Sequence, residues 1–176
     1  METLDMGVLA GLTGQRVAAG SLFTGYFELN LGDPESSAHF GTAFSSRPSG
    51  FSVDYAYIPG ETYMDGKGNV LDEADMCDIY LLLEDRSGEE VKRIATGWFR
   101  SAEEKSDAFE RISVDLVYGE LPVDTPDYQK PENGLYGGPE DEVTHISFIC
   151  TSSYLGNKFK GAIGSILVVD NLELSY

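Results

Sequence analysis

The chain has 176 residues, enough for one all-β domain, and its 41% hydrophobic content supports a core without disulfide or metal staples. Its net charge of −18, from 12 Lys and Arg against 30 Asp and Glu, excludes nucleic acid and anionic lipid headgroups as partners, because phosphates gain no attraction from such a surface. No apolar run approaches the roughly 20 residues that span a bilayer, which excludes direct membrane insertion.

Alternating apolar and polar residues predict a succession of strands. The clearest is Gly50–Gly60, in which Phe51, Val53, Tyr55 and Tyr57 share the face that we expect to be buried. The predicted strands are, in chain order, Val17–Leu29, Ala38–Phe44, Gly50–Gly60, Cys77–Glu84, Glu90–Arg100, Arg111–Tyr118, His145–Cys150 and Ser165–Tyr176.

The connections between these strands are very unequal. Arg86-Ser87-Gly88 indicates a tight hairpin, and Ser101–Ala108 predicts one helical turn because a serine is followed by acids. Glu61–Asp75 and Glu120–Asp141 are long loops, of the kind that is functional or disordered. Tight turns mixed with long crossovers favour a jelly-roll β-sandwich of two antiparallel sheets, formed by residues 1–176 as one domain.

The two cysteines, Cys77 and Cys150, both lie in apolar strand segments. We expect small buried core residues, and a disulfide remains open if their strands are neighbours. No Cys or His spacing indicates zinc.

No catalytic constellation stands out. Any pair chosen among 30 acidic residues carries almost no information about glycoside hydrolysis, which needs two carboxylates at a fixed separation across a cleft. The chain has only two histidines, and we interpret His145 as a packing or exposed residue at the start of a strand. No serine lies in a G-x-S-x-G elbow.

Binding is better supported, because aromatic rings pack on the apolar faces of sugars while polar side chains bond to hydroxyls. Tyr63, Tyr128 and Tyr136 lie in predicted loops and are candidate ligand contacts. Trp98, at the end of a strand, is either a contact or a core residue. Arg47, held extended by the proline that follows it, either ties loops together or donates to ligand hydroxyls.

A structural calcium ion is the cofactor hypothesis. Calcium takes carboxylate and carbonyl oxygens. Asp170 interrupts the last apolar strand, where a bulge would turn it inward, and Glu28 in the first predicted strand is its expected partner.

Four segments in order resemble one family: VAAGSLFTGYFEL (17–29), FGTAFSSRPSGFSVDYAYIPG (40–60), DIYLLLED (78–85) and SSYLGNKFKGAIGSILVVDNLELSY (152–176). They are similar to the putative carbohydrate metabolism domain, PCMD, of exported Bacteroidetes proteins, and Arg47 falls in that family's R-P turn. Ala43 stands where proline is often found, and Asn157-Lys158 where G-D is usual.

The resemblance implies a jelly-roll similar to carbohydrate-binding modules, a sugar-related role, and an exported location with a leader upstream of this chain. Our leading hypothesis is therefore a non-catalytic binding module for a glycan or polysaccharide. A structural or adhesin-like module with cell-surface protein partners is the alternative, and a glycoside hydrolase or lyase ranks third.

Overall fold

The computed structural model describes residues 1–10, 14–28, 30 and 37–176. Leu29, at the end of the first predicted strand, lies outside these residues. The named elements of the described residues are strands and three 3-10 turns, η1 (Gly7–Leu9), η3 (Asp127–Gln129) and η4 (Gly156–Lys158). The predicted all-β jelly-roll sandwich is confirmed.

The larger sheet is antiparallel and follows the order β12-β10-β9-β13-β3, with β6 also pairing with β13. Its strands are β12 (Val117–Tyr118), β10 (Lys92–Ser101), β9 (Cys77–Asp85), β13 (His145–Thr151), β3 (Ser21–Phe23) and β6 (Thr42–Ala43). The predicted hairpin after residue 85 joins β9 to β10, which pair from Cys77 to Asp85 with one bulge.

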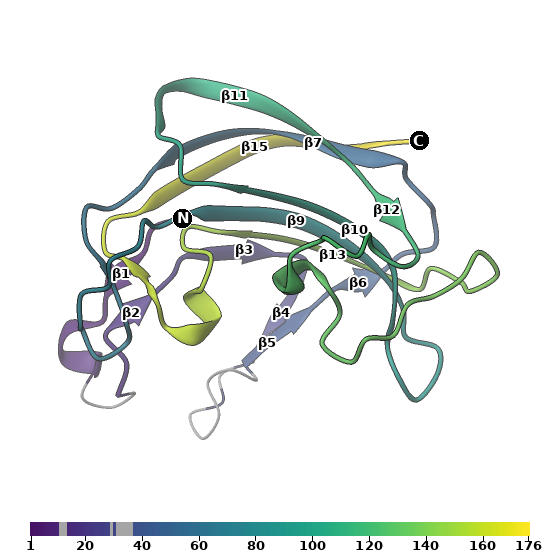
Figure 1. Ribbon diagram of the computed structural model, residues 1–176, viewed down its shortest axis with the longest axis horizontal. Helices are drawn as coiled ribbons and strands as arrows, with labels where there is room; N and C mark the ends of the chain where they lie inside the picture. The colour runs from purple at the N-terminus through teal and green to yellow at the C-terminus, as the bar shows by residue number, and fades with distance from the viewer. Residues whose placement is uncertain (11–13, 29, 31–36) are drawn as a thin grey trace.

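The smaller sheet has the order β11-β7-β15 and covers one face of the larger sheet (Figure 1). Its strands are β11 (Lys105–Asp115), β7 (Gly50–Ile58) and β15 (Ile166–Ser175). The predicted helical turn at Ser101–Ala108 is wrong, because β10 extends to Ser101 and β11 begins at Lys105. Backbone pairing of Lys105 with Tyr57 outweighs the local helical preference of the acids.

Short pairs of strands make up the rest. They are β1 (Leu4–Asp5) with β2 (Val17–Ala18), β4 (Gly25–Phe27) with β5 (Ala38–Phe40), and β8 (Tyr63–Met64) with β14 (Gly161–Ala162). The first predicted strand is therefore divided among β2, β3 and β4, and the second between β5 and β6.

The core lies between the two sheets. Phe51, Val53, Tyr55 and Tyr57 are all at most 1% exposed, as their alternation predicts. They meet the inward face of β9, and Phe51 packs edge-on against Phe148 of β13 with ring centroids 5.7 Å apart. Burial of four alternate aromatic and aliphatic side chains on one strand fixes which face of β7 turns inward.

Cys77 and Cys150 are free thiols in this core. The strands that carry them, β9 and β13, are neighbours, which is the condition that we set for a disulfide. The two cysteines nevertheless remain unbonded and pack as small core residues, as expected. Burial raises the pKa of each thiol to about 12, which keeps both protonated and unreactive at neutral pH.

Candidate functional site

The outer face of the larger sheet, which we call the floor, is the side turned away from the smaller sheet. Directly paired residues share a face, and the core takes Cys77, Ile79, Leu81 and Leu83 of β9, so the alternate residues form the floor. The floor residues are Asp78, Tyr80, Leu82 and Glu84 of β9, Arg93, Thr96, Trp98 and Arg100 of β10, and His145, Ser147, Ile149 and Thr151 of β13.

Three aromatic rings meet on this floor. Tyr80 and Trp98, paired across β9 and β10, are stacked with centroids 3.8 Å apart and planes 3° from parallel. Tyr128, in the 3-10 turn η3 of the long loop, sets its ring at 66° to Trp98 with centroids 5.5 Å apart, and it is 41% exposed. The three rings form a partly open apolar platform.

Arg100 lies beside this platform. Its Nε and Nη2 each donate a hydrogen bond of 2.6 Å to the two carboxylate oxygens of Asp78. Its guanidinium carbon lies 3.6 Å from the ring centroid of Tyr128 and 4.5 Å from that of Tyr154. The arginine is thus held between a tyrosine from the η3 loop and a tyrosine from the segment before η4, and it joins the two sides of the floor.

The acids of the floor are engaged with arginines. Burial raises the pKa of Asp78, which is 2% exposed, while Arg100 opposes that shift. Glu84, six residues along β9, accepts hydrogen bonds from Arg86 and faces Arg93 at 3.6 Å. Neither carboxylate is a free group facing solvent.

Unmet hydrogen-bonding capacity concentrates on the same face. Within the described part of the chain, four buried side-chain polar atoms have no hydrogen-bond partner, and Arg93 Nε, Trp98 Nε1 and Ser147 Oγ are three of them. All three belong to floor residues. Arg93 Nε nevertheless lies 3.6 Å from Glu84 Oε1, within the ion pair described above.

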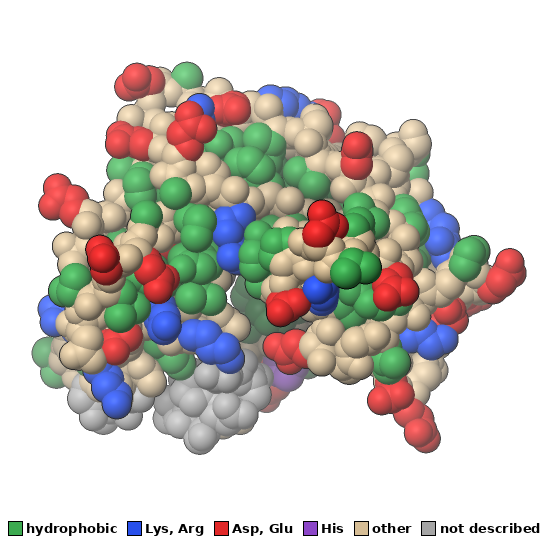
Figure 2. Space-filling model, viewed as in Figure 1, with side chains coloured by type: hydrophobic (Ala, Val, Ile, Leu, Met, Phe, Trp, Pro, Cys, Tyr) green, Lys and Arg blue, Asp and Glu red, His purple; other side chains and the backbone are tan. Residues whose placement is uncertain are grey.

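Figure 2 shows the surface over this region, which is hollowed between the η4 segment and the loop that carries η3, with hydrophobic side chains at its back. Figure 1 shows why, since these two segments extend from opposite ends of the larger sheet on the side away from the smaller one. We call this hollow, with the floor behind it, the groove.

Two of the five predicted ligand contacts, Trp98 and Tyr128, come together in the groove. The sequence analysis did not single out Tyr80, Arg100 or Tyr154, which lie beside them. The alternation of the strands could have pointed to Tyr80 and Arg100. Tyr80 alternates with the core residues of β9, and Arg100 follows Trp98 by two residues on the same face of β10. No local pattern points to Tyr154, which reaches Arg100 through the tertiary fold.

Arg47 and Tyr136 line a second cavity of about 460 Å³, together with Tyr118 and Ile94. Arg47 donates hydrogen bonds to the carbonyls of Asp141 and Pro139, at 2.6 and 3.4 Å, and lies 5.5 Å from the ring centroid of Tyr118. These contacts correspond to the loop tie considered for Arg47 in the sequence.

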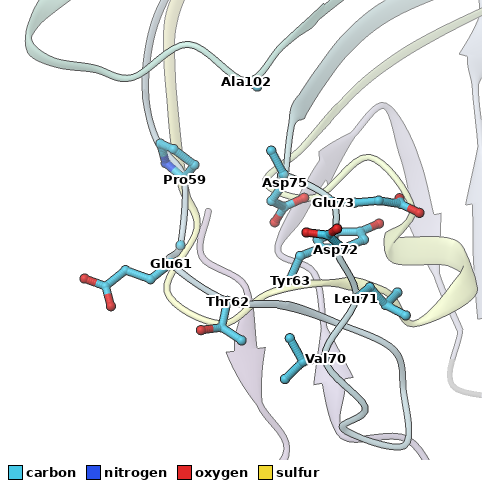
Figure 3. Close-up of a pocket in the computed structure, with 12 residues that line it drawn as sticks. Pro59, Glu61, Thr62, Tyr63, Val70, Leu71, Asp72, Glu73, Asp75 and Ala102 are labelled. Carbon is cyan, nitrogen blue, oxygen red and sulfur yellow. The ribbon is translucent and has the colours of Figure 1, made fainter.

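Tyr63 is not an open loop aromatic, contrary to the sequence interpretation. It lies in β8, is 2% exposed and stacks on Tyr154 with centroids 5.8 Å apart. The acidic loop around it forms a third cavity of about 520 Å³, in which Glu61, Asp72 and Glu73 lie around Tyr63 (Figure 3). Backbone pairing of β8 with β14 draws this part of the loop inward.

The structure does not bring Glu28 and Asp170 together as the calcium hypothesis requires. Glu28 follows β4, below the larger sheet in Figure 1, whereas Asp170 lies in β15 of the smaller sheet. The expected bulge is present between Asp170 and Glu173, but Asp170 stays exposed. Among the residues that the structure describes, no three His, Cys, Asp or Glu side chains are grouped to hold a metal ion.

Comparison with solved structures supports the fold. The whole chain is similar to a crystal structure described as a putative glycoside hydrolase from Bacteroides thetaiotaomicron, with 25% identity and a TM-score of 0.78, and it spans 52% of that protein. A putative glycoside hydrolase from Bacteroides vulgatus is similar over 99% of this chain and 71% of its own, with 28% identity and a TM-score of 0.78. No curated protein matches.

The fold is an all-β jelly-roll sandwich with aromatic rings and arginines along one face of its larger sheet. The chain belongs to the putative carbohydrate metabolism domain family, whose model matches residues 1–175, so the resemblance found in the sequence is confirmed. None of the helices in the described residues has the length and apolar content to cross a membrane.

Proposed function

We propose that this domain binds a glycan in the groove and does so without catalysing its cleavage. The observation that carries the proposal is the platform of Tyr80, Trp98 and Tyr128, with Arg100 held beside it. The rings offer apolar faces to the sugar, and the Arg100 guanidinium, which uses Nε and Nη2 on Asp78, offers its remaining edge to the sugar hydroxyls. We also propose that the domain works outside the cytoplasm, where it would encounter intact polysaccharides.

The placement of the two floor acids, Asp78 and Glu84, favours binding over hydrolysis. Asp78 and Glu84 are six residues apart on β9, which at 3.3 Å per residue separates them by about 20 Å. Glycosidase pairs lie about 5–10 Å apart, with one carboxyl free to donate a proton. Both floor acids are instead engaged with arginines.

The test is calorimetric titration with a panel of polysaccharides, comparing the wild type with Trp98→Ala and Tyr128→Ala. We expect each variant to lose affinity by about tenfold or more, because each removes a ring face from the platform. Tyr128→Ala is the safer of the two for folding, since its ring is 41% exposed. Phe109→Ala, 52% exposed in β11 of the smaller sheet, is the matched control. Unchanged affinity in Tyr128→Ala, or no heat across the panel, contradicts the proposal.

Glycoside hydrolysis is the second candidate, because both similar crystal structures carry that description. It requires a second carboxyl brought near the platform by a segment outside this chain or by a bound substrate. Release of reducing ends from the same polysaccharide panel, abolished in Asp78→Asn but retained in Asp72→Asn, would favour it over binding alone.

A further inference from the structure

One wall of the groove is basic. The η4 segment carries Lys158, which is exposed, and Lys160, which is half-buried, and Figure 2 shows Lys and Arg side chains gathered over this segment at the edge of the hollow. The segment follows Tyr154, whose ring contacts Arg100. The two lysines therefore lie four and six residues after Tyr154, at the side of the groove where Tyr154 meets Arg100.

Lys158 and Lys160 differ from most of the other basic residues of the chain, and they share the lack of an ion pair among the described residues with Arg47 and Lys67. Arg16, Arg86, Lys92, Arg93, Arg100, Lys105, Arg111 and Lys130 each pair with an acid. Lys158 and Lys160 form no ion pair within the described part of the chain. Glu73 is an acid at this wall, and it accepts a 3.0 Å hydrogen bond from the Tyr154 hydroxyl rather than an ion pair from either lysine.

Arg100 adds a third cation, and part of its guanidinium has no hydrogen-bond partner among the described residues. Asp78 takes its Nε and Nη2 edge, and no partner for Nη1 is found among the described residues. With tyrosine rings near its faces, the guanidinium keeps one edge for a further acceptor.

A net charge of −18 would seem to repel an anionic ligand, but screening limits its reach. At physiological ionic strength the Debye length is about 8 Å, so a ligand in the groove responds mainly to the charges beside it. The chain as a whole is strongly negative, with 30 acids. Along this wall, by contrast, lie two lysines without ion pairs and an arginine with one free edge.

We infer that the glycan bound in the groove is anionic, a chain whose carboxylates or sulfates face Lys158, Lys160 and Arg100 while its sugar rings pack on the platform. This inference rests on the proposed function and specifies its ligand class. Lys158 and Lys160 set the preference for charge, and Tyr128 and Trp98 supply affinity for the sugar ring.

The experiment uses two matched pairs of polymers: polygalacturonate against its carboxyl-reduced form, and dextran sulfate against dextran. We expect at least one charged polymer to bind at least about tenfold more tightly than its neutral partner, with affinity falling as sodium chloride is raised. The pair that shows the difference identifies the anion as carboxylate or sulfate.

The variant Lys158→Ala/Lys160→Ala is expected to weaken binding of the charged polymer by about fivefold or more, as the loss of two exposed ion pairs predicts. Lys105→Ala/Arg111→Ala, which removes the same charge from β11 on the opposite sheet, is the control and should bind as the wild type does. Equal weakening in both variants would show a general charge effect and overturn the inference.

The outcomes separate the two proposals. If neutral polymers bind as tightly as charged ones and Tyr128→Ala abolishes that binding, the groove is a glycan site but the inference about charge is wrong. If no polymer binds, the proposed function fails, and the inference fails with it.

Discussion

At the scale of single residues, Asp75 shows what the recognised sequence motif does. It is 1% exposed, and its Oδ2 accepts hydrogen bonds from Ser153 Oγ, Ser165 Oγ and the backbone N–H of Ala162, at 2.5, 2.7 and 2.8 Å. Gly161 belongs to the same motif, and a Cβ there would lie 2.8 Å from that of Ser153. The serines, the glycine and the alanine of the C-terminal motif therefore serve the fold, since they close around one buried carboxylate.

We predict that Asp75→Ala lowers the free energy of unfolding by about 3–5 kcal/mol, because it leaves three buried donors without their acceptor. Urea denaturation followed by far-UV circular dichroism measures the change. Asp72→Ala, an exposed neighbour in the same loop, is expected to stay within about 0.5 kcal/mol of the wild type. Equal effects in the two variants would mean that the network around Asp75 is not a stabilising element.

At the scale of elements, the long loop between β12 and β13 is attached along β10 rather than free. Gly137 N–H donates to the Arg93 carbonyl, Arg93 N–H donates to the Leu135 carbonyl, and Asn133 Nδ2 donates to the Val91 carbonyl. At its end, Asp141 accepts a 2.6 Å hydrogen bond from Lys92 Nζ. These attachments hold Tyr128 over Trp98, so the order of the loop and the shape of the groove depend on each other.

The anchor at Asp141 predicts a pH dependence. The hydrogen bond from Lys92, and then that from the Gly138 N–H, lower the pKa of Asp141 below its ordinary value near 3.8. A carboxyl whose pKa is lower in the folded state stabilises the fold above its unfolded pKa and loses that contribution as pH falls through the folded value. We therefore expect protection of the loop amides to be constant at neutral pH and to fall below about pH 4.

Hydrogen exchange of peptides from residues 120–141, corrected for intrinsic rates, measures this protection. Asp141→Asn should show already at pH 7 the reduced protection that the wild type reaches only at low pH, because the neutral amide does not hold the Lys92 ammonium as a carboxylate does. Asp124→Asn, exposed in the same loop, is the control. An Asp141→Asn loop as protected as that of the wild type would show that the backbone contacts alone hold it.

At the scale of the whole molecule, one core serves both sheets and thereby supports the groove. The inward rows of β7 and β9 meet each other, while the outward row of β9 carries Asp78, Tyr80 and Glu84. A strand that is fixed on one face by packing holds its other face in a set position. The platform is thus positioned by residues that do not touch it.

We predict that Phe51→Ala costs about 3–5 kcal/mol of stability, because it removes a ring 1% exposed that packs against Phe148 across the two sheets. Unfolding should remain a single transition, with far-UV circular dichroism and Trp98 fluorescence coinciding, because the lone tryptophan reports on the floor. Phe109→Ala, on the exposed side of β11, should cost less than about 1 kcal/mol. Two separate transitions would mean that the sheets do not share one core.

The sequence by itself determined the class of fold, the inward face of β7, the core position of both cysteines and the family, because period-two alternation and ordered motifs are local properties of the chain. It misjudged Ser101–Ala108 and Tyr63, because in each case pairing with a distant strand overrides the local preference. It named Trp98 and Tyr128 without relating them to each other.

Only the tertiary structure decided which candidates share a site. The pairing of β9 with β10 brings Tyr80 to Trp98, the attachment of the long loop to β10 brings Tyr128 over them, and the chain after β13 brings Tyr154 to Arg100. The same topology leaves Glu28 just after β4, which pairs with β5, and places Asp170 in β15 of the smaller sheet. The physical reason is that strand order and loop docking depend on contacts between residues far apart in the chain, which no local pattern records.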